Sequence, residues 1–258
     1  MNKKTIPAFL LAAIVSASAF GQAQKGDPKA TEYYTPVPKV VTPGASSSDA
    51  PSDAIILFDG KNLDAWASNK NPAEPAGWIV ADNVITVNKM AGDIQTKRSF
   101  QDFQLHIEWR IPSNITGTGQ ARGNSGVFLG ALPFGAGGYE LQVLDNYENT
   151  TYVNGQAGSI YKQNPPLVNA CRKPGEWQTY DVVWTAPRFN EDGTVKSPAR
   201  VTVLHNGVLV QNNFELKGDT PYIGQPAYAK HGAVPIKLQA HGDKSEPVSY
   251  RNIWLREL

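Results

Sequence analysis

The stretch from residue 103 to residue 111, Phe-Gln-Leu-His-Ile-Glu-Trp-Arg-Ile, carries the clearest structural pattern in the chain. Apolar side chains at the odd positions alternate with polar side chains at the even positions. This period of two is typical of a β-strand with one face in a hydrophobic core and the other toward water. The polar residues His106, Glu108 and Arg110 are expected to pair with one another on that solvated face.

A similar periodicity continues through most of the chain after Ile55, and no stretch longer than a turn or two keeps the 3.6-residue spacing of a helix. The short strand candidates are separated by Gly, Pro and Asn turns, and Asn206-Gly207 is a type I′ hairpin signal. Because alternating helices are missing, a parallel α/β fold is disfavoured, and a barrel or a two-sheet sandwich remains. We predict an all-β fold, a two-sheet antiparallel β-sandwich.

The further strand candidates are residues 78–87, 126–130, 139–145, 177–185, 201–205, 208–214, 235–241 and 248–256. Residues 114–123 and 188–199 are expected to be loops. His205, beside the hairpin turn, and His231, in a Gly-rich loop, are expected at the surface.

The first 54 residues are not expected to belong to the folded domain. Lys3 and Lys4 precede an apolar run over residues 6–15, and small residues follow at 17–19 and 21–23, which is the pattern of a secretory signal peptide. Residues 24–54 are rich in Pro and Ser and predict an extended or disordered linker. We therefore expect a signal peptide at 1–23, a linker at 24–54 and a domain at 55–258, in a periplasmic or secreted protein.

Composition excludes several classes of partner and chemistry. The 24 basic and 23 acidic residues nearly cancel, so nothing points to nucleic acid or to an anionic membrane surface. No apolar run approaches the roughly 20 residues of a membrane span, and no cysteine near the cleavage region can carry a lipid anchor. Cys171 is the only cysteine, so no intrachain disulfide forms, and we expect a small buried residue there. Motifs for nucleotide binding, for a hydrolase nucleophile elbow and for zinc are missing.

Two strand candidates carry polar side chains that could form a site. Period two places Glu140 and Gln142 on one face of their strand, and it places Gln239 and His241 side by side on another, with Lys237 in line. If both strands belong to one sheet, a carboxylate, an imidazole and two amides share a surface. Such a set can bind a sugar and move a proton. The alternative is that the outer face of a sandwich is polar only because it is solvated.

The residues that flank these strands are candidates for the rim of the site. Two glycines frame Asn124 and Ser125 directly before a strand, and this tight backbone can place Arg122 and Asn124 at the mouth of the sheet; an ordinary turn is the alternative. Asp145 and Asn146 end their strand, so they either cap a turn or line the rim. Calcium is a candidate ligand there, although no spaced Asp/Asn loop accompanies them. No metal ligands are assigned, and the cofactor requirement stays open.

Six segments, taken together and in order, form a recognisable set. They are Leu57-Phe-Asp-Gly-Lys-Asn-Leu-Asp-Ala-Trp66, Arg122-Gly-Asn-Ser-Gly-Val-Phe128, Tyr139-Glu-Leu-Gln-Val-Leu-Asp-Asn146, Trp177-Gln-Thr-Tyr-Asp181, Asn206-Gly-Val208 and Tyr250-Arg-Asn-Ile-Trp254. This set resembles one family, the 3-keto-disaccharide hydrolases first catalogued as DUF1080. The resemblance covers residues 55–258 and implies a concanavalin A-like lectin/glucanase jelly roll with its site on the concave sheet.

The resemblance implies an enzyme that cleaves 3-keto-glycosides or 3-keto-disaccharides. A ketone at C3 acidifies the C2 proton, so a base can remove it, the C1 group departs by elimination, and water then adds back. We expect Glu140 and His241 to be the catalytic residues, one as the base and the other as the acid or orienting group. The expected substrate-binding residues are Arg122, Asn124, Gln142, Asp145, Gln239 and Arg251. Alternation places Arg251 with Ile253 and Leu255, so a structural role is its alternative.

Two other functions compete with this prediction. A non-catalytic glycan-binding module would line the face with aromatic residues such as Trp66, Trp78 or Tyr147 and would tolerate the loss of His241. A conventional endo-glucanase would need a Glu-x-Asp-x-x-Glu strand, which the chain lacks, and it ranks last. The expected partners are a carbohydrate substrate and an oxidoreductase that supplies its ketone, with no nucleic acid and no membrane anchor.

Overall fold

The computed structural model describes residues 26–133 and 137–258, so the predicted signal peptide lies outside the described residues. The chain divides into two units, residues 1–40 and residues 41–258. The described part of the first unit holds one 3-10 helix, η1 (Pro28–Thr31). Among the described residues, no helix is both long and apolar enough to span a membrane.

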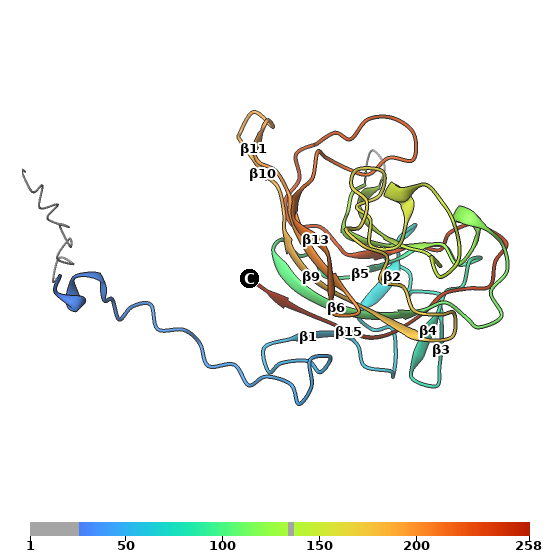
Figure 1. Ribbon diagram of the computed structural model, residues 1–258, viewed down its shortest axis with the longest axis horizontal. Coiled ribbons are helices and arrows are strands. Elements are labelled where there is room, and N and C mark those ends of the chain that lie inside the picture. The colour runs from blue at the N-terminus through green and yellow to red at the C-terminus, as the bar shows by residue number, and fades with distance from the viewer. Residues whose placement is uncertain (1–25, 134–136) are drawn as a thin grey trace, which may run out of the picture. The chain divides into compact units, whose positions relative to one another are not determined.

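The second unit contains two antiparallel sheets, and the larger one, sheet A, has eight strands. Strand β1 pairs with β15 beside the main path of this sheet. In Figure 1 the neighbouring strands β9, β6 and β15 lie side by side. The strands of sheet A follow the spatial order β13 (Val208–Glu215), β12 (Arg200–His205), β9 (Trp177–Thr185), β6 (Phe103–Arg110), β15 (Ser249–Glu257), β4 (Val84–Thr86) and β3 (Ile79–Ala81), with β1 (Ile55–Phe58) added.

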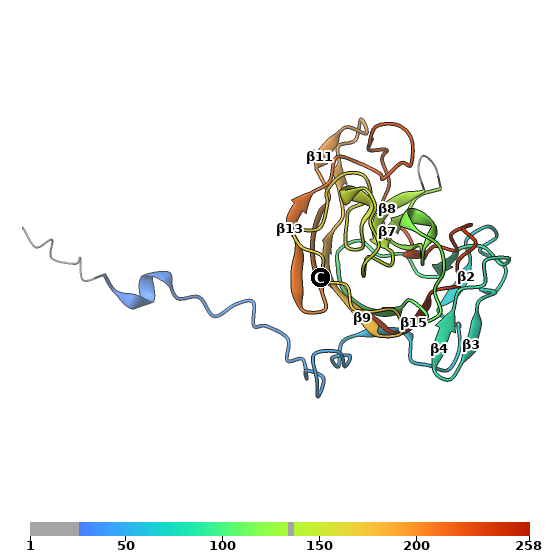
Figure 2. The same cartoon turned by 45° about the vertical axis from the view of Figure 1, so that its right-hand side comes forward.

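Sheet B has five strands, and Figure 2 shows its strands β7 and β8 facing β9 and β13 of sheet A. The order in sheet B is β2 (Trp66–Ser68), β5 (Ile94–Thr96), β14 (Lys237–Leu238), β7 (Ser125–Ala131) and β8 (Gly138–Val143). The remaining elements are the short hairpin β10 (Arg188–Phe189) with β11 (Val195–Ser197) and the 3-10 turns η2 (Gly119–Ala121) and η3 (Val153–Gly155). The predicted all-β, two-sheet antiparallel sandwich of the concanavalin A-like type is therefore confirmed.

One hydrophobic core lies between the sheets and explains why the alternating pattern predicted the strands. Leu105, Ile107 and Trp109 of β6 are at most 1% exposed, and on sheet B Leu141 and Val143 of β8 are fully buried. Burying one aliphatic side chain of this size contributes about 1.5–3 kcal/mol. Because these residues take every second position, the intervening side chains of β8 point to the outer face of sheet B.

Three local predictions have different outcomes. Asn206 and Gly207 both have positive φ, 53° and 78°, as a type I′ turn requires, so the hairpin is confirmed. The single strand expected at residues 78–87 is instead the hairpin of β3 and β4, because Asp82 and Asn83 take positive φ and reverse the chain. The loop expected at residues 188–199 contains the hairpin β10–β11.

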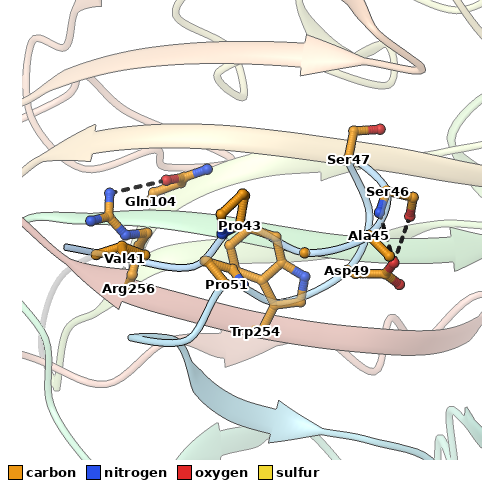
Figure 3. Close-up of a pocket in the computed structure, with 11 residues that line it drawn as sticks. Val41, Pro43, Ala45, Ser46, Ser47, Asp49, Pro51, Gln104, Trp254 and Arg256 are labelled. Atoms are coloured by element: carbon orange, nitrogen blue, oxygen red, sulfur yellow. Dashed lines mark hydrogen bonds between the residues drawn. The ribbon is translucent and has the colours of Figure 1, made fainter.

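The face of β6 that was expected to be solvated is covered. The His106 ring stacks on Trp254 with their ring centroids 5.3 Å apart, and it is 1% exposed. Both Trp254 Nε1 and Asn252 Nδ2 donate to the Ser48 carbonyl at 2.9 Å. Figure 3 shows residues 41–51 running across this face beside Trp254. The expectation of a solvated face is wrong, because the segment 41–53 covers it.

This covering segment lies in the same unit as the sandwich. The unit begins at Val41, whereas the sequence placed the linker's end at residue 54. The carbonyl of Ser48 and the carboxylate of Asp53, which bonds Arg256 Nη2 at 2.8 Å, attach the segment to β15. A segment rich in Pro and Ser carries little helix or strand pattern of its own, so these long-range bonds are not visible in its composition.

Two histidines expected at the surface lie elsewhere. His205 is 1% exposed and packs against Trp109 and Tyr180. Burial, with a smaller contribution from nearby Arg172, lowers the pKa of His205 to about 3. The ring of His231 is half-buried, and its Nε2 lies 2.8 Å from the hydroxyl of Tyr139.

Candidate functional site

The polar faces of β8 and β14 meet on the outer face of sheet B, with β7 between them. Glu140 of β8 and Lys237 of β14 both lie opposite Phe128, and Gln142 lies opposite Gly126. The next residue pair continues this register, because the Gln239 N–H donates to the Gly126 carbonyl at 3.0 Å. Strand pairing thus gathers side chains that are 97 residues apart in the sequence, Glu140 with Lys237 and Gln142 with Gln239.

The polar side chains of this face, Lys237 excepted, line a cavity of about 160 Å³ together with residues of the flanking loops. Five of the eight predicted site residues contribute to it, which are Glu140, His241, Asn124, Gln142 and Gln239. The prediction that Glu140, Gln142, Gln239 and His241 share one surface is borne out by this geometry. The remaining lining residues are Phe128, Tyr161, Thr220 and Tyr222.

Gly126 forms the floor beneath the Glu140 carboxyl group. A Cβ atom placed on Gly126 would lie 2.4 Å from Glu140 Oε1 and 3.0 Å from its Cδ. Contacts this short are forbidden, so any side chain at residue 126 forces the carboxyl group to move. Glycine is therefore needed here for close approach, and the carboxyl group lies directly over the middle strand.

The carboxyl group of Glu140 is set up to hold a proton near neutral pH. Its residue is 5% exposed, and burial raises its pKa to about 8, with nearby Lys237 opposing the shift and Asp93 adding to it. Burial disfavours the charged carboxylate, which is why the neutral form persists. A carboxyl group with this pKa can donate a proton at pH 7, which is the property of a general acid.

His241 is oriented by a carboxylate that the sequence analysis did not single out. The Nδ1 atom of His241 lies 2.8 Å from Asp243 Oδ2. Lys89 Nζ donates to Asp243 Oδ1 at 3.0 Å, and the Ser245 N–H donates to the same oxygen at 2.8 Å. Burial works to raise the Asp243 pKa, but the hydrogen bonds from His241, Ser245 and Lys89 hold it well below its usual range.

An ionised Asp243 determines which nitrogen of His241 is the base. Because the carboxylate accepts a hydrogen bond from Nδ1–H, the neutral ring carries its lone pair on Nε2. A carboxylate behind an imidazole also stabilises the protonated ring that forms when Nε2 takes a proton. The pair His241–Asp243 therefore has the geometry of a general base.

Two amides complete the cavity wall. Gln142 Nε2 donates to Asn124 Oδ1 at 2.9 Å, and Asn124 Nδ2 donates to the Gln120 carbonyl at 2.8 Å, so Asn124 orients Gln142. Gln239 Oε1 is buried and has no hydrogen-bond partner among the described residues. A buried acceptor without a partner costs about 1–3 kcal/mol.

Three predicted substrate-binding residues do not line this cavity. Arg122 Nε bonds Asp145 Oδ2 at 2.5 Å, and the Asp145 side chain is 1% exposed, so this ion pair joins the loop before β7 to the end of β8. Arg251 lies on sheet A, where its Nε bonds Glu108 Oε2 at 2.6 Å and its guanidinium group stacks on Trp177.

A β-bulge explains why alternation misplaced Arg251. The pairing of β15 with β6 shifts register between Arg251 and Trp254, where Asn252 has a φ of 45°. A bulge inserts a residue into one strand, so side chains beyond it change face. Arg251 consequently lies on the face of Trp254 and Glu108 rather than with Ile253 in the core.

Some lining residues carried no usable sequence signal. Tyr161, Thr220 and Tyr222 come from loops that reach the edge strand β8, and their proximity depends on long-range contacts. The Tyr161 N–H donates to the Glu140 carbonyl, and the Glu140 N–H donates to Thr220 Oγ1, both at 3.0 Å. Asp243 could have been found, because it follows His241 by two residues.

Possible metal ligands are dispersed over the described part of the chain. No group of three or more His, Cys, Asp or Glu side chains gathers there in a way that could hold an ion. Asp145, the residue considered for calcium, is bonded to Arg122 and to the Tyr147 N–H.

Comparison with known protein families identifies the family of the chain. The model of the 3-keto-alpha-glucoside-1,2-lyase-like domain matches residues 53–256. The chain belongs to this family. The family resemblance expected from the sequence is thereby confirmed, and the cavity lies within the matched lyase-like domain.

Solved structures agree with this assignment. A "putative glycosyl hydrolase" from Parabacteroides distasonis ATCC 8503 is 57% identical, with a TM-score of 0.85, over 92% of this chain and 99% of that one. A second protein of the same description and organism is 22% identical, with a TM-score of 0.58, over 80% of this chain and 99% of that one, and shows the fold alone. No curated protein matches the chain. The lyase-like domain is thus a glycosyl hydrolase-like, carbohydrate-active protein.

Proposed function

We propose that the protein cleaves 3-keto-glycosides by removing the C2 proton, eliminating the C1 substituent and then adding water. The observation that carries the proposal is that a carboxyl group with a pKa of about 8 and a carboxylate-oriented imidazole line the same cavity. A carboxyl group that stays protonated at neutral pH and an imidazole held in place by a carboxylate suit complementary acid and base roles.

The first step uses His241 as the base. Its Nε2 takes the proton from C2 of the sugar, and the electron pair left behind is delocalised onto the C3 ketone oxygen as an enolate. Asp243 stabilises the imidazolium ring that results. Both amide hydrogens of Gln142 are already bonded, to Asn124 Oδ1 and to the Val143 carbonyl, so Gln142 acts as part of the wall. The dipoles of the cavity wall, the Gln239 amide among them, can stabilise the enolate oxygen as its charge develops.

The second step uses Glu140 as the acid. The enolate electron pair forms the C1–C2 double bond while the bond between C1 and its oxygen substituent breaks. The Glu140 carboxyl proton goes to that oxygen, so the leaving group departs as a neutral alcohol. Water then adds across the double bond, with its hydroxyl group on C1 and its proton on C2, which returns 3-keto-glucose and completes a net hydrolysis.

Hydrolysis through an oxocarbenium ion is the competing chemistry, and it uses two carboxyl groups across the scissile bond. Among the described residues that line the cavity, Glu140 is the only carboxylic acid. The second carboxylate near the site, Asp243, is bonded to His241, Lys89 and Ser245, which suits a role behind the imidazole. The geometry therefore favours elimination.

The test is product analysis by mass spectrometry with purified protein in heavy water. The substrates are a 3-keto-glucoside and, separately, its unoxidised parent. We expect 3-keto-glucose from the ketone alone, with one deuterium at C2, because solvent supplies the C2 proton during hydration. Cleavage of the parent as well, or product without deuterium, would contradict elimination. Measurable binding without any cleavage would favour the non-catalytic glycan-binding module.

The proposed reaction needs a preceding oxidation, because ordinary glycosides carry a hydroxyl group at C3. An oxidoreductase that oxidises this hydroxyl is therefore the expected partner in the reaction sequence. From the sequence pattern at residues 1–23 we also propose that this protein acts in the periplasm or outside the cell. Fractionation of the cells that produce the protein would test this location.

A further inference from the structure

A second cavity of about 500 Å³ adjoins the catalytic cavity. Tyr161 and Tyr222 line both, so the two cavities share a wall. The second cavity is also lined by Tyr152, Asn154, Lys162 and Gln225, none of which lines the first. It is formed by two loops, the one that contains η3 and the one at residues 221–226.

The sizes of the cavities indicate how a substrate divides between them. Pockets that bury a drug-sized ligand measure roughly 300–1,000 Å³, and the catalytic cavity, at about 160 Å³, falls below that range. It has room for the sugar that reacts and little more. Whatever is attached to C1 must therefore lie outside it, and the cavity beyond the shared tyrosines offers the space.

The lining of the second cavity indicates what kind of group fits there. Three tyrosine rings surround Lys162, whose Nζ lies 4.2 Å from the Tyr222 ring centroid and 5.6 and 5.8 Å from those of Tyr152 and Tyr161. The ammonium group also donates to the Tyr222 carbonyl at 2.5 Å, so its charge is already engaged. Tyr222 keeps 69% of its surface exposed, which leaves an aromatic surface available.

Polar lining groups accompany the rings. Asn154 and Gln225 contribute amides to the cavity, and Lys162 is the single charged residue among its lining residues that the structure describes. Aromatic surface with a few fixed polar groups is typical of small-molecule sites. A carboxylate or phosphate would find one cation that is already hydrogen-bonded.

We propose that this second cavity binds the leaving group of the substrate, and that the leaving group is a neutral ring with an apolar face stacked on Tyr222. This inference rests on the proposed function, which places the reacting sugar in the adjoining cavity. Two sources share this chemistry, a second pyranose and an aryl group. The contribution of the amides would favour the pyranose.

The test compares three 3-keto-glucosides whose C1 groups are methyl, p-nitrophenyl and glucosyl. We expect Tyr222→Ala to raise KM about tenfold for the two ring-bearing substrates, because it removes a ring contact. Because Tyr222 also lines the catalytic cavity, the methyl glycoside reports the effect of Tyr222→Ala on the reacting sugar, and its KM should rise clearly less than that of the ring-bearing substrates. Tyr222→Phe should restore both ring-bearing substrates. Ile79→Ala, an exposed apolar residue on sheet A, is the control.

Gln225→Ala separates the two ring chemistries, because Gln225 lines only the second cavity. A KM raised for the glucosyl substrate alone assigns the cavity to a sugar. If Gln225→Ala raises KM for neither ring-bearing substrate while Tyr222→Ala raises KM for both, the second cavity is assigned to an aryl group. Equal losses for the methyl glycoside in Tyr222→Ala would overturn the proposal, because Tyr222 would then act on the reacting sugar.

Failure of the proposed function remains distinguishable from failure of this inference. If the wild-type protein cleaves none of the three ketones, the proposed function fails. Calorimetric measurement of binding by the unoxidised methyl and ring-bearing glycosides then tests the second cavity independently of catalysis. Tighter binding of the ring-bearing glycosides, lost in Tyr222→Ala, would support the inference, and equal affinities would contradict it.

Discussion

At the scale of single residues, the site depends on how closely the Glu140 carboxyl group approaches Gly126. We predict that Gly126→Ala lowers kcat about 100-fold, because a displacement of roughly 1 Å at the reacting groups has an effect of this size. The fold should survive, since the atom displaced is the far end of a side chain. Turnover of a 3-keto-glucoside and the circular dichroism spectrum measure the two effects.

A matched control exists at Gly232. A Cβ on that residue meets nothing within 4 Å, so Gly232→Ala should leave turnover unchanged. Unimpaired activity in Gly126→Ala would show that the carboxyl group does not need its observed position. That result would contradict the role of Glu140 as the acid.

The raised pKa of Glu140 predicts the alkaline limb of the activity profile. Since the acid acts in its protonated form, kcat/KM should fall tenfold per pH unit above a pKa of about 8. Glu140→Gln should lower turnover by about 10²–10⁴-fold, the usual contribution of general acid catalysis. Glu191→Gln, a substitution at an exposed loop residue, should change neither the pH profile nor the turnover rate. A profile that stays flat up to pH 9.5 would count against the assignment.

The same shift predicts how stability depends on pH. Burial raises the folded-state pKa of Glu140 from the ordinary value of 4.5 to about 8, so between these values the folded chain binds more protons than the unfolded chain. Stability therefore decreases as pH rises through this window and levels off above it. Glu140→Gln should flatten this slope, as urea unfolding at pH 5, 6.5 and 8 would show. An identical slope in both proteins would contradict the raised pKa.

At the scale of secondary-structure elements, the bulge in β15 determines which of its side chains face the core and which face outward. Asn252 has a φ of 45°, and its Nδ2 donates at 2.9 Å to both the Ser48 carbonyl and Glu108 Oε1. Asn252→Ala should therefore lower the free energy of unfolding by about 1–3 kcal/mol through the lost bonds, beyond any backbone strain. Urea denaturation measures the change.

Asn213→Ala is the matched control, because Asn213 has a φ of 46° on exposed strand β13 and its side chain makes no hydrogen bond among the described residues. The Asn213→Ala variant should lose only the stability that comes from the tolerance of Asn for a positive φ. Equal losses in the two variants would mean that the Asn252 bonds contribute nothing.

At the scale of the whole molecule, the segment 41–53 completes the sandwich by covering the outer face of sheet A. A chain that begins at Val41 should unfold at the same urea concentration as the chain that includes residues 26–40. A chain that begins at Ile55 should lose about 2–5 kcal/mol, because Trp254, now 3% exposed, and its bonds to Ser48 would face water. Equal stability of the two shorter chains would show that the covering segment is dispensable.

Most of the fold could be predicted because strand patterns are local. Period two in β6 and β8 distinguishes inward from outward side chains wherever pairing is regular, and it placed Glu140 and Gln142 correctly. It failed at Arg251, where a bulge interrupts the period, and at residues 78–87, where two positive-φ residues reverse the chain. Bulges and turns of this kind depend on tertiary context more than on local composition.

The sequence by itself determined the all-β class, the family and the four residues Glu140, Gln142, Gln239 and His241 of one shared face. Only the tertiary structure decided that Gly126 lies beneath Glu140, that Asp243 orients His241, and that Tyr161 and Tyr222 divide two cavities. The physical reason is the range of the interactions. Alternation and motifs are written in neighbouring residues, whereas burial, pKa shifts and cavities arise when strands and loops distant in the sequence pack together.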